Sequence, residues 1–337
     1  MEIMQREVYG FLPNPSFSLS ASEPQTVEAR YMCAAVEHSF VNLTVTVGER
    51  THTFRVDRLL HTDGRRRPLV VFLNFHPELK SHYFPVEEMS EHDADYLVAC
   101  YKEITSDDAD FTNGIAPVLL PDGQAQNDTA GKIALWAWSA MRVLDYGLTL
   151  PSTDPDNIAI AGHSRLGKTA LFAAMMDARF RFVLSNNAGC TGDALSRGNS
   201  GHTRPYRAPD RGELISDIVR VFPYWFCKNY QKYTEKSYAD TFDQHFLLGA
   251  IAPRFVLVGS CDEDHWADPL SEQLCALAAS PAWEEQGLSG LIAPDRVALS
   301  GESFLDGHVG YYKLHSRHFL SRHGWRHFMT FIEKHKA

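Results

Sequence analysis

Residues 162–169 read GHSRLGKT and fit two chemically different motifs. The first is the P-loop pattern G-x-x-x-x-G-K-[ST], in which backbone N–H groups hold phosphates, Lys168 contacts the β/γ oxygens and Thr169 binds magnesium. The second is a nucleophile elbow, in which Ser164 lies on a tight strand-to-helix turn and attacks an acyl carbon. Both motifs need a strand before them and a helix after them, and residues 157–180 supply that pattern for either. Other parts of the chain must therefore decide.

The P-loop interpretation gains little from the rest of the chain. A P-loop usually follows the first strand of its domain, whereas three or more strand patterns precede residue 162. It also needs an Asp at the end of an apolar strand to hold the metal. Asp262 or Asp264, in FVLVGSCDED, would have to serve. The sequence shows no other nucleotide-binding feature, which favours the elbow.

The elbow interpretation makes demands that the sequence meets. Gly162 leaves room where strand and helix nearly collide, although the second glycine of G-x-S-x-G is displaced from position 166 to Gly167. In α/β-hydrolases the triad acid and histidine follow the serine in that order, each after a later strand. The acid candidates after the strand pattern RFVLVGS are Asp262, Glu263, Asp264 and Asp268. The histidine candidates before the final helix pattern are His308, His315, His318 and His323.

These residue types together predict acyl transfer by a serine nucleophile. A histidine would take the proton of Ser164 as the hydroxyl attacks. The backbone N–H of Arg165, directly after the serine, is placed to stabilise the oxyanion. No cofactor is required. None of the 16 histidines shows H-x-x-x-H or H-E-x-x-H spacing paired with a clear third ligand, so no metal is expected.

Composition narrows the class of protein. The chain has 337 residues, 44% of them hydrophobic and 22% charged, which is typical of a globular protein with a sizeable core. The formal net charge is −10 and the one basic run, residues 65–67, is short, so neither nucleic acid nor membrane is an expected partner. We also expect no obligate protein partner. The start of the chain lacks an apolar signal region, and six scattered cysteines show no C-x-x-C, which favours a cytoplasmic location with reduced thiols.

Hydrophobic patterning predicts the fold that must position these side chains. Residues 41–60 alternate apolar and polar side chains, as antiparallel strands do. Continuous apolar runs typical of strands buried on both faces then recur, at residues 67–76, 95–101, 157–162, 181–189, 254–260 and 295–301. Helix patterns separate several of them, most clearly in residues 131–147. We therefore expect a single α/β domain over residues 1–337, with a doubly wound, mostly parallel sheet, and residues 1–40 wrapping its surface.

From about residue 41 onward, the chain resembles the glucuronoyl esterases, carbohydrate esterase family 15, and especially their bacterial members. GHSRLGK fits the family's serine motif G-x-S-R-x-G-K at every fixed position, which accounts for the displaced glycine. The segments ALWAWSAMRVLDY, HFLLGAIAPR, DHWADP and RHFLSRHGW also resemble bacterial members, in order. The resemblance implies an α/β-hydrolase fold, a three-layer sandwich with helices on both faces of the sheet. It also implies a cofactor-free serine esterase acting on a carbohydrate, most of all on 4-O-methyl-glucuronoyl esters that link xylan to lignin.

The resemblance also implies which candidates act in catalysis. Ser164 is the nucleophile, and the Arg165 side chain faces the oxyanion. The family's acid stands two residues before a tryptophan, which selects Asp264, with Glu263 as second choice. The family's histidine stands seven residues before a tryptophan, which selects His318. Fungal members instead carry their acid where this chain has Asn187, an amide that can offer hydrogen bonds but no charge.

Three residues are implied to bind the substrate: Lys168 through hydroxyls of the sugar ring, Trp266 at its border, and Glu213 in a stretch that resembles the pocket lining. Trp225 lies in the same stretch, and Phe222 falls near a position where fungal members offer a polar contact. Two alternatives stay open. One is an esterase of the same fold that removes acetyl groups from xylan or other sugars, and the other is a catalytically silent carbohydrate-binding protein.

Overall fold

The computed structural model of the chain describes residues 1–30, 35–197, 212–235 and 241–337. Its centre is one sheet in the order β1-β3-β4-β6-β5-β7-β8-β9-β11-β10, with β2 paired to β3. The strands are β1 (Ser18–Ala21), β2 (Gln25–Arg30), β3 (Val36–Val47), β4 (Arg50–His61), β5 (Arg67–Asn74), β6 (Asp95–Cys100), β7 (Thr153–His163), β8 (Phe182–Asn186), β9 (Phe255–Cys261), β10 (Ser303–Phe304) and β11 (Val309–Leu314). The six strands from β6 to β11 through β5, β7, β8 and β9 are parallel, and the flanking pairs are antiparallel.

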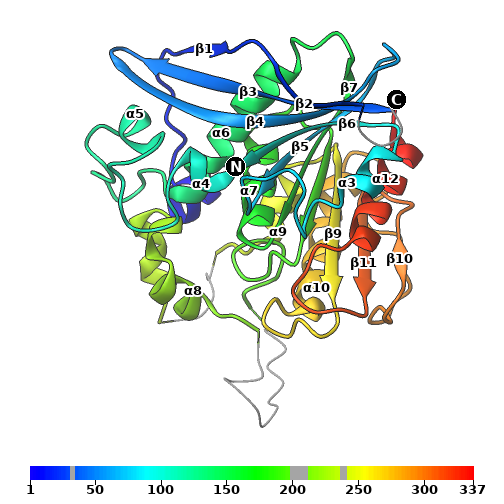
Figure 1. Cartoon of the computed structure of the whole chain (residues 1–337). Coiled ribbons are helices and arrows are strands. Elements are labelled where there is room, and N and C mark those ends of the chain that lie inside the picture. The colour runs from blue at the N-terminus through cyan, green and yellow to red at the C-terminus, as the bar shows by residue number, and fades with distance from the viewer. Residues whose placement is uncertain (31–34, 198–211, 236–240) are drawn as a thin grey trace.

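The sheet is covered on both faces, as the continuous apolar runs predict. Side chains of β5 alternate between two separate cores, with Leu69, Val71 and Leu73 in one and Val70 and Phe72 in the other. The first core is closed mainly by α6, α7 and α10, and the second by α3 and α12. Figure 1 shows the long β3–β4 hairpin at one end of the molecule and α12 beside β11.

Short and long helices alternate with the strands through most of the chain. They are α1 (Glu2–Met4), α3 (Val86–Ser90), α4 (Tyr101–Ile104), α5 (Ala116–Leu119), α6 (Lys132–Gly147), α7 (Arg165–Met176), α8 (Ile215–Val221), α9 (His245–Gly249), α10 (Pro269–Ala279), α11 (Pro281–Glu284) and α12 (Arg322–His335), with η1 (Gln5–Tyr9), η2 (Pro223–Trp225) and η3 (Lys228–Tyr233). The helix expected at residues 131–147 is thus present as α6.

One strand expectation is wrong. Residues 295–301 form no strand. Their three apolar residues in a row are too few to cross the sheet, and the segment is held instead by Gln273, which accepts from the Ala298 N–H at 2.9 Å and donates to the Arg296 carbonyl at 2.9 Å. The last parallel strand is β11, whose sequence VGYYKL was not read as a strand. Because β11, and not residues 295–301, is the last parallel strand, it determines at which end of the sheet each candidate histidine lies.

The segment of residues 1–40 differs from a simple surface wrap at its start. Met4, Val8 and Tyr9 are fully buried in the first core, and the Gly131 N–H donates to the Tyr9 carbonyl at 2.9 Å. The Tyr9 ring packs on Phe172 of α7, with centroids 4.5 Å apart, so the start of the chain contributes to the core as well as to the surface. Among the described residues, no helix combines the length and the apolar character needed to cross a bilayer.

Candidate active site

Ser164 lies at the sharp turn between β7 and α7. Its backbone has φ 58° and ψ −127°, a conformation that costs a non-glycine residue about 1–3 kcal/mol. The Ser164 N–H is held by the Asn186 carbonyl of β8 at 2.9 Å, and its own carbonyl begins the hydrogen bonding of α7. Strain of this kind, stabilised by the surrounding sheet, is the geometry of a nucleophile elbow.

The two glycines of the motif are required by contacts of different kinds. A Cβ on Gly162 would lie 1.9 Å from the Leu166 carbonyl oxygen, inside the turn itself. A Cβ on Gly167 would lie 3.0 Å from the Ala188 Cβ and 3.1 Å from the Ser185 Oγ, between α7 and the end of β8. Position 166 points into the core instead, where Leu166 is fully buried. The displaced glycine is therefore explained by packing of α7 against β8.

The structure argues against the P-loop interpretation. The helix begins at Arg165, so no extended loop separates the strand from the helix to wrap a phosphate chain. The Thr169 hydroxyl donates to the Arg165 carbonyl at 2.9 Å inside the helix. The Lys168 ammonium donates to the Ala188 carbonyl and is buried. Both side chains that a nucleotide and its magnesium would need are turned toward protein groups.

Asp264 and His318 are joined by a hydrogen bond. The His318 Nδ1 and the Asp264 Oδ2 are 2.5 Å apart, with the carboxylate buried and the imidazole 45% exposed. Asp264 follows the end of β9, and His318 follows the end of β11, so the two side chains meet at the same edge of the sheet as Ser164. A carboxylate on Nδ1 fixes the tautomer in which Nε2 is free to accept a proton.

The competing acids have other partners. Asp262 pairs with His315, at 2.9 Å between Oδ2 and Nδ1, and accepts from the Ser300 hydroxyl. Glu263 forms an ion pair with Arg317 at the solvent-exposed surface. Asp268 caps α10, accepting from the Ser271 N–H at 3.2 Å and from its hydroxyl at 2.8 Å. All three therefore have structural reasons to be where they are.

The competing histidines lie elsewhere. His308 stands at the start of β11, at the opposite edge of the sheet from Ser164, where its ring stacks on Phe255 with centroids 4.5 Å apart. His315 belongs to the exposed pair just described, and His323 is an exposed residue of the first turn of α12. Because β11 carries the chain across the sheet between His308 and His318, only the later histidine arrives beside the serine.

Asn187, at the alternative acid position, contacts Asp264 directly. Its Nδ2 donates to the Asp264 Oδ2 at 2.8 Å, and its Oδ1 accepts from the Cys261 thiol at 3.4 Å. Burial raises the pKa of that thiol to about 12, so it stays a neutral donor. The amide thus stabilises the negative charge of Asp264 rather than supplying one of its own.

Arg165 is held on the other side of the serine. Its Nη1 donates to the carboxylate of Asp107, and its guanidinium carbon lies 4.6 Å from the centroid of the Trp225 ring. The Phe75 N–H, in the loop after β5 where such folds usually offer a second oxyanion donor, donates to the Asn74 Oδ1 at 2.9 Å. That N–H is already engaged. The Arg165 backbone N–H, directly after the serine, and the Arg165 side chain, which lines the same cavity, are therefore the candidate oxyanion donors.

One cavity of about 170 Å³ brings the candidate residues together. Its lining includes Ser164, Arg165, Lys168, Asn187, Glu213, Trp225, Trp266 and His318. Six of the seven residues implied for catalysis or binding line this cavity, and the seventh, the buried Asp264, is hydrogen-bonded to His318. Trp266 is 42% exposed at its border, and the Glu213 N–H donates to the Trp266 carbonyl at 2.8 Å.

Two ionisable groups near the cavity have shifted pKa values. Burial raises the pKa of Glu213, while the Lys168 ammonium and the Trp266 side chain lower it. Burial, and then the charge of His318, hold the pKa of His163 well below its usual range. The rings of His163 and His318 are 4.5 Å apart, so His163 stays neutral and adds no competing charge.

Behind the cavity lies a fully buried carboxyl pair, Asp193 and Glu272. The Gly189 N–H lies 2.8 Å from the Asp193 Oδ1 and 3.2 Å from the Glu272 Oε1. The Ser185 hydroxyl donates to the other Asp193 oxygen at 2.6 Å. Burial and the neighbouring Asp193 raise the pKa of Glu272 well above its usual range, so the pair shares a proton.

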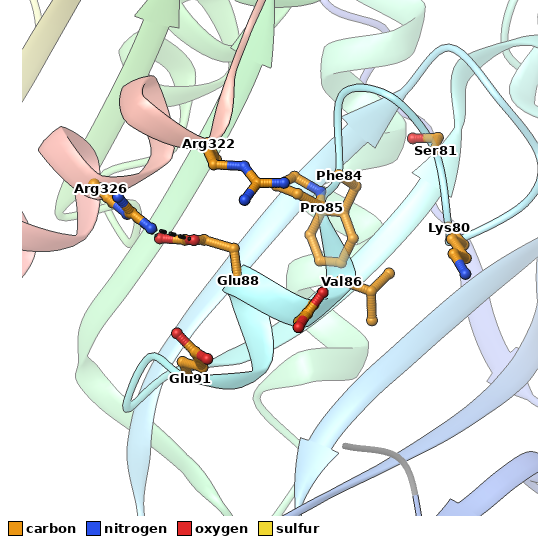
Figure 2. Close-up of a pocket in the computed structure, with 10 residues that line it drawn as sticks. Lys80, Ser81, Phe84, Pro85, Val86, Glu88, Glu91, Arg322 and Arg326 are labelled. Atoms are coloured by element: carbon orange, nitrogen blue, oxygen red, sulfur yellow. Dashed lines mark hydrogen bonds and ion pairs between the residues drawn. The ribbon is translucent and has the colours of Figure 1, made fainter.

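A second cavity, of about 390 Å³, lies between α3 and the start of α12 (Figure 2). Its lining includes Lys80, Phe84 and Arg322, and the ion pair of Arg326 with Glu88 closes one side. None of the candidate catalytic residues lines it. Within the described residues, no group of three His, Cys, Asp or Glu side chains is arranged to hold a metal ion.

Comparison with known proteins relates the chain to glucuronoyl esterases. Residues 124–287 match the model of the family described as glucuronyl esterase, fungi. A prokaryotic relative, carbohydrate esterase MZ0003 from an unknown organism, is 34% identical over 238 residues, which cover 68% of this chain and 51% of that protein. The chain spans about half the length, or less, of the curated relatives it matches.

Two solved structures extend the likeness over nearly the whole chain. A glucuronoyl esterase from Solibacter usitatus superposes with a TM-score of 0.87 at 26% identity, covering 99% of this chain and 90% of that one. A promiscuous family 15 esterase from a marine bacterial metagenome gives a TM-score of 0.86 at 26% identity, covering 99% and 89%. The expected resemblance to bacterial family 15 esterases is confirmed, and so is the α/β-hydrolase fold.

Proposed function

We propose that this chain is a serine esterase that cleaves glucuronoyl esters of carbohydrates. The observation that carries the proposal is the shared cavity, in which the strained Ser164 lies with Arg165 and with a histidine bound to a buried carboxylate. The relatives named above as carbohydrate and glucuronoyl esterases support the same reaction class.

The first half of the reaction forms an acyl-enzyme. The Ser164 Oγ attacks the ester carbonyl while the His318 Nε2 takes the hydroxyl proton, and the Asp264 carboxylate stabilises the imidazolium through Nδ1–H. The carbonyl oxygen becomes an oxyanion beside the Arg165 N–H groups. As the tetrahedral intermediate collapses, His318 returns the proton to the departing alcohol.

The second half releases the acid. A water molecule, deprotonated by His318, attacks the acyl carbon, and Ser164 leaves with the proton that His318 returns. The same oxyanion donors serve both halves, because the second tetrahedral intermediate forms at the same carbon. All of the chemistry is supplied by side chains and backbone of this chain, without a cofactor.

Three residues of the cavity favour a sugar acid as the acyl group. Lys168, which keeps further N–H donors beside its bond to the Ala188 carbonyl, and Glu213 bring an ammonium and a carboxyl group to the cavity lining, and Trp266 presents an exposed aromatic face. Aromatic rings next to polar groups are suited to sugars, whose C–H faces pack on the ring while the hydroxyls hydrogen-bond. The apolar wall of Phe222 and Trp225 favours a second candidate, hydrolysis of smaller acyl esters such as acetylated sugars.

Hydrolysis of benzyl glucuronate, measured beside that of an acetylated xylo-oligosaccharide, tests the proposal. Wild type, Ser164→Ala and the surface control Ser300→Ala are compared. We expect cleavage of the glucuronate ester by wild type and control, and none above background by Ser164→Ala. Cleavage of the acetylated sugar alone would select the second candidate. A wild-type protein that cleaves neither, and whose Ser164 resists a fluorophosphonate probe, would instead match a silent carbohydrate-binding protein.

A further inference from the structure

The Asp107 carboxylate accepts hydrogen bonds from side chains of three separate segments next to the cavity. Its Oδ2 accepts from the Arg165 Nη1 and from the Tyr101 hydroxyl at 2.9 Å. Its Oδ1 accepts from the Trp225 Nε1 at 2.7 Å and lies 3.4 Å from the Tyr224 hydroxyl, which also donates to the Asp107 carbonyl at 2.9 Å. The Asp107 side chain is 9% exposed, so its charge is satisfied almost entirely by protein groups.

These contacts hold both the Arg165 guanidinium and the aromatic rings on which it lies. The rings of Phe222 and Trp225 are stacked, with centroids 3.8 Å apart and planes within 1° of parallel. The Arg165 guanidinium carbon lies 4.6 Å from one ring centroid and 5.2 Å from the other. Asp107 therefore anchors the guanidinium and, through the indole N–H, the aromatic face beneath it.

The segment that carries Asp107 is itself fastened by a buried cation. The Lys132 ammonium, from a fully buried side chain at the start of α6, donates to the Thr105 Oγ1 at 2.9 Å and to the Asp110 carbonyl at 2.6 Å. The Asn113 Oδ1 accepts from the Ser106 N–H at 2.9 Å and closes the loop. Asp107 is thus held in place by the core rather than by a freely moving surface loop.

We propose that Asp107 is a positioning residue of this esterase, which fixes the Arg165 guanidinium where the oxyanion forms. This inference rests on the proposed function, because it gives Arg165 its role at the oxyanion. Only one Nη of Arg165 is used by Asp107, and its Nε is buried without a hydrogen-bond partner among the described residues. Donors therefore remain for an oxygen in the cavity that Arg165 lines.

The effect of removing Asp107 follows from what the arginine loses. Without the carboxylate, the guanidinium keeps its charge and its aromatic contacts but no longer has a fixed in-plane orientation. Misplacing a reacting or stabilising group by about 1 Å costs on the order of 100-fold in rate. Because an oxyanion donor acts mainly in the transition state, the loss should fall on kcat, with KM changed little.

A double-mutant cycle between Asp107→Asn and Arg165→Gln tests the proposal. The readouts are kcat and KM on p-nitrophenyl acetate and benzyl glucuronate, and the rate at which a fluorophosphonate labels Ser164. We expect Asp107→Asn to lower kcat and the labelling rate about 100-fold in wild type, and less than about threefold in the Arg165→Gln background. Tyr224→Phe is the matched control, since it removes a hydroxyl from Asp107 but leaves the ion pair intact. It should keep kcat within about threefold.

The outcomes separate this inference from the proposed function. Equal losses in both backgrounds would show that Asp107 does not act through Arg165 and would overturn the inference. So would a loss in Tyr224→Phe as large as in Asp107→Asn. If Asp107→Asn does not fold, Asp107→Glu replaces it, since a carboxylate displaced by one methylene should lower kcat without raising KM. Hydrolysis of p-nitrophenyl acetate but not of benzyl glucuronate would refute only the glucuronoyl substrate. The double-mutant cycle could then still be measured on p-nitrophenyl acetate.

Discussion

Asp264→Asn is the substitution that separates the candidate acids most sharply. It replaces one oxygen by an NH₂ group of nearly the same shape, in a side chain that is 5% exposed. The Asp264 Oδ2 lies 2.5 Å from the His318 Nδ1 and 2.8 Å from the Asn187 Nδ2. The variant must direct its new NH₂ either at these two groups or at the Ala267 N–H, which lies 3.4 Å from Oδ1. In either orientation, the new NH₂ group faces another N–H donor.

The expected loss follows from the two roles of the carboxylate. The amide carries no charge to stabilise the imidazolium, and an N–H aimed at Nδ1 favours the tautomer in which Nε2 carries the proton and cannot act as a base. In a serine–histidine–aspartate triad, this change lowers kcat by about 10⁴-fold. That loss corresponds to about 5.4 kcal/mol of barrier height.

The assay is steady-state hydrolysis of p-nitrophenyl acetate, with Glu263→Gln as the matched control. Glu263 is 44% exposed and pairs with Arg317 at the surface, so its loss should change kcat by less than about twofold. Circular dichroism and thermal unfolding confirm that both variants are folded. An Asp264→Asn variant with more than a tenth of wild-type kcat would refute the assignment, as would a Glu263→Gln variant that loses as much.

Four further substitutions test the packing and the charges around the site. Gly162→Ala should destabilise the fold by more than about 4 kcal/mol in urea unfolding, because its Cβ would meet the Leu166 carbonyl at 1.9 Å, whereas Gly167→Ala should cost less. Burial lowers the pKa of Lys132 from 10.5 to about 8, so the unfolded chain binds more protons between these values. The stability of wild type should therefore rise relative to Lys132→Met as pH increases through that range. The raised pKa of Glu272 has the opposite effect on the pH dependence of stability, because at that residue the folded state binds the extra proton. Wild type should thus lose stability relative to Glu272→Gln as pH rises above about 4.5, and parallel pH profiles for either pair would contradict the reasoning.

The chain order of the motif, the acids and the histidines was enough to place the site at one edge of a parallel sheet. It was not enough to choose among neighbours. Asp262, Glu263 and Asp264 are consecutive, and which one points at the histidine depends on the turn in which the Asp264 N–H donates to the Cys261 carbonyl at 3.1 Å. A turn of that kind has no periodic pattern, so the choice rested on the resemblance.

The role of Asp107 could not be predicted from its sequence position. Its loop has the polar composition of an ordinary connection, and its partners come from residues up to 118 positions away. Lys132 likewise reads as the polar start of an amphipathic helix, although its side chain is fully buried. Both side chains acquire their roles only when α6, α7 and η2 are packed together, which makes them invisible to local patterns.

The contact between Asn187 and Asp264 has a consequence for how such sites diverge. Residue 187 follows β8 and residue 264 follows β9, yet their side chains are one hydrogen bond apart and share the neighbourhood of a single imidazole. With Asp264 as the acid in the proposed mechanism, a lineage can transfer that role from one strand to the next by two point substitutions, without moving His318 or Ser164. Two arrangements of one triad are then neighbours in sequence space rather than separate inventions.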